Sequence, residues 1–145
     1  IYTCWNKGHT WNFINQAEMH NFIESSICMR PERLQNPKHP TQKPLVLLSR
    51  IILASTQPGA SMLDPFAGSS TTGIAANLLG RRFLGIDQSE EFLEISRERK
   101  EEITDKEKAT EYLEKLQRQA KIFADREVFM LGEEENVYGI KELPF

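Results

Sequence analysis

The sequence predicts an α/β fold with parallel strands, and three observations support this prediction. An apolar helical pattern precedes a short strand pattern, which leads directly into a loop of small residues with glycines at 68 and 73. A second helical pattern, a second strand pattern and Asp87 follow in that order. Strand, glycine loop, helix and strand are typical of a βαβ unit, whose two strands are parallel. Polar helical patterns after Asp87 predict a helical C-terminal extension.

The first helix is expected over residues 45–56. Pro44 suits the first turn of a helix, and Pro58 with Gly59 ends it. The expected buried face consists of positions spaced by three and four, namely Leu45, Leu48, Ile51, Ile52 and Ser55. Residues 61–64 are expected as a buried strand, residues 74–79 as a helix closed by Gly80, and residues 82–86 as the second strand.

The extension is expected to hold two helices. The first covers residues 89–103, and a capping box of Thr104 with Glu107 starts the second, which runs to about Asp125. An apolar stripe at spacings of three and four marks its packed face: Ala109, Leu113, Leu116, Ala120 and Phe123. The stripe is too short for a coiled coil. Residues 128–131 form a candidate edge strand.

The N-terminal third predicts less regular structure. Residues 1–13 alternate apolar and polar side chains around a turn at Lys7–Gly8, which favours two short extended pieces. A helix is expected around residues 17–23. Residues 30–44 hold four prolines and are expected to form an ordered loop or a linker.

The composition is that of one ordinary folded domain. The chain has 145 residues, of which 39% are hydrophobic and 27% charged, which excludes collagen, a disulfide scaffold and wholesale disorder. The longest apolar stretch, residues 45–54, is too short and too polar to span a bilayer, so no membrane association is expected. The chain begins at Ile1 without a charged leader, so we expect no signal peptide, and instead a fragment or a processed chain.

Two cysteines, Cys4 and Cys28, are too few for a disulfide framework. We expect both to be reduced, buried thiols, as is common in cytosolic proteins. A zinc site that combines them with His9 and His20 has suitable ligand atoms but lacks a recognised spacing.

The charge is divided unevenly along the chain. Residues 1–88 hold eight basic and five acidic residues, whereas residues 89–145 hold ten and sixteen. The basic side chains gather in residues 30–50, where Glu32 is the single acidic residue: Arg30, Arg33, Lys38, Lys43 and Arg50. This stretch suits a phosphate backbone, although a solvated loop would have the same composition.

The glycine loop fits neither of two common phosphate-binding motifs. Gly68 and Gly73 have the spacing of a P-loop, but Ile74 stands where the phosphate-binding lysine is required. A dinucleotide fingerprint requires G-x-G-x-x-G, and Ser70 replaces its middle glycine. A nicotinamide-binding oxidoreductase therefore remains a weaker alternative.

A third pattern begins earlier. Asp64-Pro65-Phe66-Ala67-Gly68-Ser69-Ser70-Thr71-Thr72-Gly73, with Gly85-Ile86-Asp87 behind it, resembles the S-adenosylmethionine loop of DNA amino-methyltransferases, D-P-F-x-G-S-G-T-T. Ser70 is the one departure. His39-Pro40-Thr41-Gln42-Lys43-Pro44 matches the family motif H-P-T-Q-K-P throughout. The order of the two motifs resembles the permuted β class, in which the cofactor part follows the catalytic part. The resemblance covers residues 30–97.

The resemblance implies a partial Rossmann-like methyltransferase fold that binds S-adenosylmethionine. The backbone amides of residues 68–72 would receive the methionine carboxylate, and Asp87 would accept the ribose hydroxyls. Asp64 and Phe66 would line the methionine end, while His39 is expected to make a structural hydrogen bond. The cofactor-binding residues implied are His39, Thr41, Lys43, Asp64, Phe66, Ala67, Gly68, Ser69, Ser70, Thr71, Thr72 and Asp87.

The implied activity is methyl transfer from S-adenosylmethionine to an exocyclic amine of double-stranded DNA, as in restriction–modification enzymes. Adenine N6 is favoured over cytosine N4 on family frequency. Arg30, Arg33 and Lys38 would contact the DNA. The family's catalytic motif, D/N/S-P-P-Y/F/W, is missing, because the chain has no Pro-Pro pair. No residue of this chain is therefore expected to be catalytic.

We therefore expect residues 1–145 to form a single incomplete domain. Residues 1–37 would end the catalytic and target-recognition part, residues 38–97 would hold the cofactor motifs, and residues 98–145 would form the helical tail. A separate chain or an N-terminal segment would carry the catalytic motif, and the chain alone would be inactive. A location in the bacterial cytoplasm, at the nucleoid, is implied. The alternative is a non-catalytic remnant that binds DNA or a partner protein.

Overall fold

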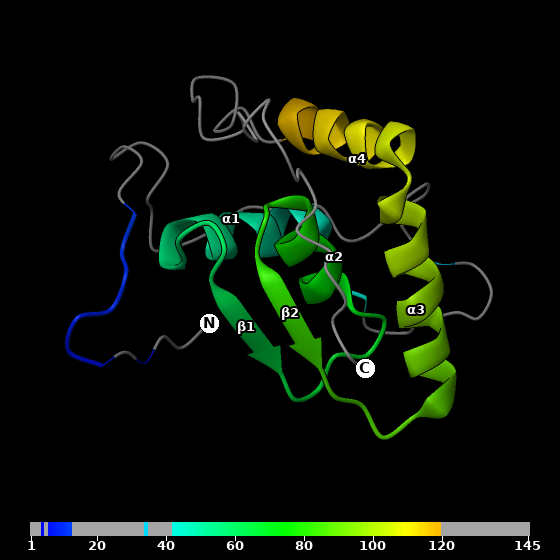
Figure 1. Cartoon of the computed structure of the whole chain (residues 1–145), viewed down its shortest axis with the longest axis horizontal. Helices are drawn as coiled ribbons and strands as arrows, with labels where there is room; N and C mark the ends of the chain where they lie inside the picture. Colours follow the sequence, from blue (N-terminus) through cyan, green and yellow to red (C-terminus); the bar gives the residue numbers. More distant parts are fainter. Residues whose placement is uncertain (1–3, 5, 13–33, 35–41, 120–145) are drawn as a thin grey trace.

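A computed structural model describes residues 4, 6–12, 34 and 42–119. Two strands and four helices follow one another in the described part (Figure 1). Their order is α1 (Leu45–Ser55), β1 (Ser61–Asp64), α2 (Thr71–Leu78), β2 (Arg82–Gly85), α3 (Glu90–Thr104) and α4 (Lys106–Gln119). The strands are parallel and joined through α2. The predicted α/β unit and its helical extension are thereby confirmed, as far as Gln119.

The two strands present one covered and one uncovered face. Met62 pairs with Phe83; Phe83 belongs to the hydrophobic core and the partly buried Met62 packs against it, whereas the next pair is Leu63 with Leu84. Leu63 is 62% exposed and Leu84 is 50% exposed. The predicted strand at residues 61–64 is therefore confirmed, but the expectation that it is buried is wrong. Parallel sheets are normally covered on both faces, but the described helices cover one.

The hydrophobic core lies where α1, α2 and β2 meet, and α3 and α4 extend it. Its most buried members are Ile52, Ala75, Ala76, Leu78, Ile103, Ala109 and Leu116. On α1, Ser49, Leu53 and Ala54 are buried, while Leu48, Ile51 and Ser55 are only partly so. The buried face is therefore rotated from the predicted one. Nearly every position between 45 and 54 is apolar, so periodicity could not determine which side faces the core.

The helix boundaries depart from the predictions at two places. α2 begins at Thr71, three residues earlier than expected, with Ser70 at its N-cap position. The predicted capping box is wrong, because Thr104 still belongs to α3 and donates its hydroxyl to the Lys100 carbonyl at 3.0 Å. Asp105 takes the capping role, and its Oδ1 accepts the Glu107 amide at 2.9 Å. Aspartate is as good a cap as threonine.

The described N-terminal residues form a turn but no strand. His9 donates its amide to the Asn6 carbonyl at 3.1 Å, and Gly8 has φ +83°, which confirms the turn at Lys7–Gly8. Asn12 joins this segment to the end of α1, since its Nδ2 donates to the carbonyls of Leu53 and Thr56, both at 2.8 Å. Within residues 6–12 the expected extended pieces form no strand, and Asn12 instead attaches the segment to the end of α1, also through its backbone amide, which donates to the Ala54 carbonyl at 2.7 Å.

Cys4 is exposed, which contradicts the expected burial of its thiol. Among the described residues, no group of three or more histidine, cysteine or acidic side chains could hold a metal ion. The other two ligands of the hypothetical zinc site, His20 and Cys28, lie outside the described residues, as do the predicted elements at 17–23, 30–33, 120–125 and 128–131. No helix in the described ranges is long and apolar enough to cross a membrane.

Candidate functional site

The loop between β1 and α2 covers residues 65–70. The side chain of Asp64, the last residue of β1, forms hydrogen bonds on both sides of this loop. Asp64 Oδ1 accepts the Phe66 amide at 3.1 Å, and Oδ2 accepts the Thr72 hydroxyl at 2.8 Å. One carboxylate therefore connects the end of β1 to the first turn of α2. The ring of Phe66 is 83% exposed beside it.

Asp87, two residues beyond the end of β2, reaches the same loop from the neighbouring strand. Its Oδ2 accepts the Gly68 amide at 2.8 Å, and its Oδ1 accepts the Ser89 amide at 2.9 Å. The Ala67 amide donates to the Ile86 carbonyl at 2.9 Å, beside this contact. Parallel strands bring their carboxyl ends to one edge of the sheet, so a residue there can contact both the loop and a ligand.

Helix α3 holds the loop from the other side. Ser96 donates its hydroxyl to the Gly68 carbonyl at 3.2 Å. Arg99, only 6% exposed, donates its Nη1 to the Ser69 carbonyl and, at 3.2 Å, to the Thr71 hydroxyl. Sequence reasoning missed both residues. The available signal was weak: they lie three positions apart on one face of a helix that is otherwise highly charged.

Two loop residues have left-handed backbone conformations. Gly68 has φ +53° and Ser70 has φ +57°. A non-glycine residue in this region costs about 1–2 kcal/mol relative to its usual conformations. The family's glycine at the position of Ser70 therefore has a conformational explanation, and this chain keeps the glycine-like backbone with a serine.

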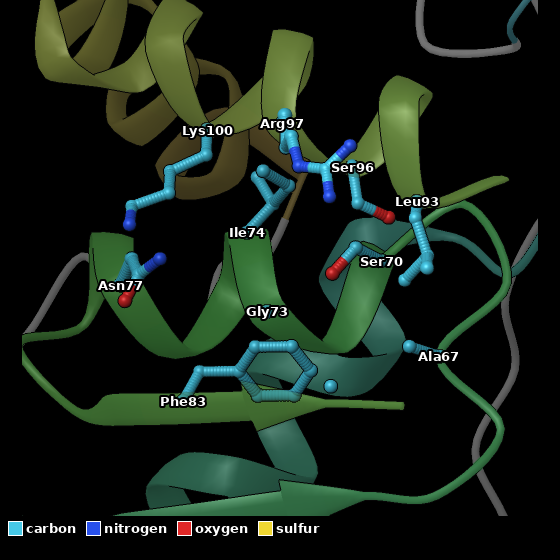
Figure 2. Close-up of a pocket in the computed structure, with 11 residues that line it drawn as sticks. Ala67, Ser70, Gly73, Ile74, Asn77, Phe83, Leu93, Ser96, Arg97 and Lys100 are labelled. Atoms are coloured by element: carbon cyan, nitrogen blue, oxygen red, sulfur yellow. The ribbon is translucent and has the colours of Figure 1, made fainter. Parts of the chain in front are cut away.

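Phe83 of β2 fills the space beneath the loop, and two glycines let the backbone approach it. A Cβ added at Gly73 would lie 2.5 Å from the Phe83 ring and 2.7 Å from Ser70 Oγ. A Cβ at Gly85 would lie 2.8 Å from the same ring and 2.9 Å from Ala67 Cβ. Figure 2 shows the ring directly beneath Gly73. The spacing between α2, the loop and β2 therefore depends on both glycines.

A small cavity of about 40 Å³ lies between α2, β2 and α3. Ile74, Phe83 and Leu93 form its apolar wall, and Lys100 and Asn77 lie at one end (Figure 2). Burial lowers the pKa of the Lys100 ammonium. A cavity of this volume can hold a water molecule but no nucleoside. Ala67 and Ser70 of the loop also line it, so the cavity lies directly behind the candidate cofactor site.

The first turn of α2 can bind an anion. Backbone geometry leaves the amides of Thr71, Thr72 and Gly73 without acceptors inside the helix. The side chain of Ser70, at the N-cap, makes no capping hydrogen bond. These amides lie at the positive end of the helix dipole and can donate hydrogen bonds to a carboxylate or a phosphate of a ligand.

The structure brings most of the predicted cofactor residues together. Direct hydrogen bonds link the pairs Asp64–Phe66, Asp64–Thr72, Ala67–Ser70 and Gly68–Asp87. Ser69 and Thr71 are joined through Arg99. Lys43 is exposed just before α1 and makes no hydrogen bond to the loop within the described residues. His39, Thr41 and the candidate DNA contacts Arg30, Arg33 and Lys38 lie outside the described residues, so their roles stay predictions.

The βαβ unit defines an α/β protein whose glycine-containing loop lies at the carboxyl ends of two parallel strands, where ligands bind in folds of this class. The family model N6_N4_Mtase, described as DNA methylase, matches residues 4–98. That match covers well over half of the 145 residues, so the chain belongs to the N6/N4 DNA methylase family. The resemblance drawn from the two sequence motifs is confirmed.

Three curated relatives, each named a type II methyltransferase, are similar to part of the chain. M2.MboI of Moraxella bovis is 66% identical over 67 residues, which cover 46% of this chain and 24% of the relative. M2.DpnII of Streptococcus pneumoniae is 64% identical over 64 residues, covering 44% and 24%. M2.LlaDCHI of Lactococcus lactis subsp. cremoris is 58% identical over 87 residues, covering 60% and 32%. The chain thus spans about a quarter to a third of these relatives.

A solved crystal structure of the M1.HpyAVI–SAM complex is similar in fold. The similarity covers 63% of this chain and 43% of that chain, with a TM-score of 0.51 and 36% sequence identity. This similarity confirms the predicted class, a partial methyltransferase α/β fold with parallel strands.

Proposed function

We propose that this chain supplies the S-adenosylmethionine-binding part of a restriction–modification DNA methyltransferase. The observation that carries the proposal is the loop 65–70, held between Asp64 at the end of β1 and Asp87 beyond β2. Membership of the N6/N4 family, the type II names of the relatives and the similarity to a methyltransferase solved in complex with S-adenosylmethionine support it.

The described residues fit the chemistry of this cofactor. Bound S-adenosylmethionine supplies an electrophilic methyl group on a positively charged sulfur. The uncapped first-turn amides of α2 would receive its carboxylate, as helix N-termini do with other anions. A carboxylate has about four acceptor positions, so Asp87 can hold the amides of Gly68 and Ser89 and still accept ribose hydroxyls.

The remaining predicted cofactor residues would close the site. The exposed ring of Phe66 would pack against the bound ligand beside Asp64. Lys43 is exposed before α1 and, with Thr41 and His39, would approach from the segment that precedes the helix. The other members of the site carry no charge. They would shape the cofactor site through their backbone and small side chains: Ala67, Ser69, Thr71 and Thr72.

We propose the N6 amine of adenine as the methyl acceptor, within double-stranded DNA. Adenine is the more frequent target among enzymes with these motifs, and the similarity to three type II methyltransferases supports a restriction–modification role. Arg30, Arg33 and Lys38 would contact DNA phosphates. The three relatives come from bacteria, which supports a bacterial location at the nucleoid.

The base-binding motif would come from another segment or another chain. The sequence has no Pro-Pro pair, and its Asp64-Pro65 pair already serves the loop. The uncovered sheet face with Leu63, Leu84 and Ile86, all at least half exposed, supports docking of such a segment. This chain alone would therefore bind the cofactor and leave DNA unmethylated.

Equilibrium dialysis of the purified chain against labelled S-adenosylmethionine and, separately, labelled NAD tests the proposal. We expect retention of S-adenosylmethionine alone, and no transfer of labelled methyl groups to added DNA. Retention of NAD without S-adenosylmethionine would overturn the cofactor assignment. Methyl transfer to DNA by the chain alone would overturn the division of the site between two segments. If the chain binds no cofactor but binds added DNA with a strong dependence on salt, the non-catalytic alternative is supported instead.

A further inference from the structure

Ser96 and Arg99 lie on one face of α3, and both donate hydrogen bonds to backbone carbonyls of the loop. The Ser96 hydroxyl shares its single proton between the Phe92 carbonyl of α3, at 2.8 Å, and the Gly68 carbonyl, at 3.2 Å. Arg99 Nη1 donates to the carbonyl of the next residue, Ser69. Arg99 is almost fully buried, which is unusual for an arginine and requires that its donors be used. Two consecutive loop carbonyls therefore point at α3.

The direction of a carbonyl determines the direction of the amide in the same peptide unit. In a trans peptide the C=O and the following N–H point to opposite sides. With its carbonyl held by Ser96, the Gly68–Ser69 peptide turns the Ser69 amide away from α3. The left-handed backbones of Gly68 and Ser70, on either side of Ser69, are of the kind that gathers amides into an anion-binding concavity.

Arg99 also acts at the start of α2. The same Nη1 donates to the Thr71 hydroxyl at 3.2 Å, so one nitrogen joins the loop to the first residue of the helix. Its positive charge lies at the N-terminal end of α2, where the helix dipole is also positive. Both charges favour an anionic group at the uncapped amides.

We propose that Ser96 and Arg99 are positioning residues for the cofactor loop: they direct the carbonyls of Gly68 and Ser69 toward α3. This turns the Ser69 amide to the ligand side and keeps the Ser70 amide on the Ala67 carbonyl at 2.8 Å, so that the loop holds its shape. This inference rests on the proposed function, because the ligand is taken to be S-adenosylmethionine. Neither residue needs to contact the ligand. Their effect is on ligand affinity through the orientation of two peptide units.

The test compares Ser96→Ala and Arg99→Lys with Arg97→Lys as a matched control. Alanine is the best helix former, so Ser96→Ala removes the Gly68 contact with the least risk to folding. Arg99→Lys keeps the charge but loses the planar fork. Arg97 lies on the same helix, is exposed, pairs with Glu94 at 2.7 Å and makes no hydrogen bond to the loop among the described residues. Calorimetry with S-adenosylmethionine gives the Kd, and backbone amide exchange reports on individual loop amides.

We expect the Kd to rise about 3–10-fold in Ser96→Ala and about 10-fold or more in Arg99→Lys, because bonds to charged groups are stronger. Amide exchange should accelerate at Ser69 and Ser70 but not at Phe83 in β2, and Arg97→Lys should match the wild type. If Arg99→Lys does not fold, Ser96→Ala decides. An unchanged Kd and unchanged loop exchange in Ser96→Ala would overturn the inference, as would uniform acceleration across β2. If the wild type binds no S-adenosylmethionine, the proposed function fails, and loop exchange still tests the positioning.

Discussion

Asp87 Oδ2 lies 2.8 Å from the backbone nitrogen of Gly68, nineteen residues earlier in the chain. The other carboxylate oxygen accepts the Ser89 amide at 2.9 Å. This one side chain therefore joins the end of β2, the loop after β1 and the start of α3. The residue expected to hold the cofactor ribose therefore also holds the loop that we propose as the site for the rest of the cofactor.

Replacing Asp87 tests this double role. Asp87→Ala should lower the free energy of unfolding by about 1–3 kcal/mol, because two backbone amides lose a charged acceptor. Asp87→Asn should lower the free energy of unfolding nearly as much. Its amide has one acceptor oxygen, so its NH₂ group would face one of the two backbone N–H donors. Thermal denaturation measures the change. Glu98→Gln, on the exposed side of α3, is the control with the same chemistry. An Asn variant as stable as the wild type would contradict the account of this carboxylate.

Ser70→Gly should stabilise the chain. Ser70 has φ +57°, where glycine has no Cβ penalty, so we expect a gain of about 1 kcal/mol. Ser69→Gly is the matched control: Ser69 lacks a positive φ, so added backbone freedom should lower stability by about 0.5–1 kcal/mol. Chemical denaturation of both variants measures the difference. Equal effects of the two substitutions would show that the backbone of Ser70 is not strained.

Gly73→Ala should destabilise the chain by about 1–3 kcal/mol through overpacking against Phe83. The added methyl carbon would lie 2.5 Å from the Phe83 ring. Phe83→Leu alone also removes core volume and should cost about 1–2 kcal/mol. The double variant should cost clearly less than the two single changes together, because the smaller side chain makes room for the methyl group. If the losses of stability in the double-mutant cycle are additive, the methyl group at position 73 does not clash with the Phe83 ring.

The phenol of Tyr112 should titrate above its ordinary pKa of about 10. Burial raises this pKa first, and the charge of Glu102, whose Oε2 accepts the phenol hydroxyl at 3.3 Å, raises it further. The contribution of Tyr112 to stability is therefore complete below pH 10 and is lost as the pH rises through the folded-state pKa. A difference absorbance titration against Tyr112→Phe measures it. A phenol that titrates at or below 10 would contradict the packing of α4 on α3.

Local patterns predicted the βαβ unit and the loop between Asp64 and Asp87. Strand ends, glycines and acidic residues follow one another within 25 residues, so patterns of neighbouring residues are enough to predict this unit. The buried face of α1 could not be predicted in the same way, because its apolar positions are nearly continuous. The exposure of Leu63 and Leu84 follows from what packs on the sheet, which a strand pattern does not contain.

The contacts of Ser96 and Arg99 were unpredictable for a different reason. They join residues 28 and 30 positions apart, and they depend on how α3 packs against α2 and the loop. In the sequence, Arg99 is one of many charged residues on a polar helix, and its charge alone suggests exposure to solvent.

Calorimetric titration of the folded chain with S-adenosylmethionine, beside Asp87→Ala and the Glu98→Gln control, tests the central claim most directly. We predict binding of one molecule per chain, at least 10-fold weaker in Asp87→Ala and unchanged in the control. Circular dichroism at the same temperature establishes that each variant is folded. A folded wild-type chain that binds no S-adenosylmethionine, or that binds it equally well without the Asp87 carboxylate, would contradict the claim that this loop and this aspartate form the cofactor site.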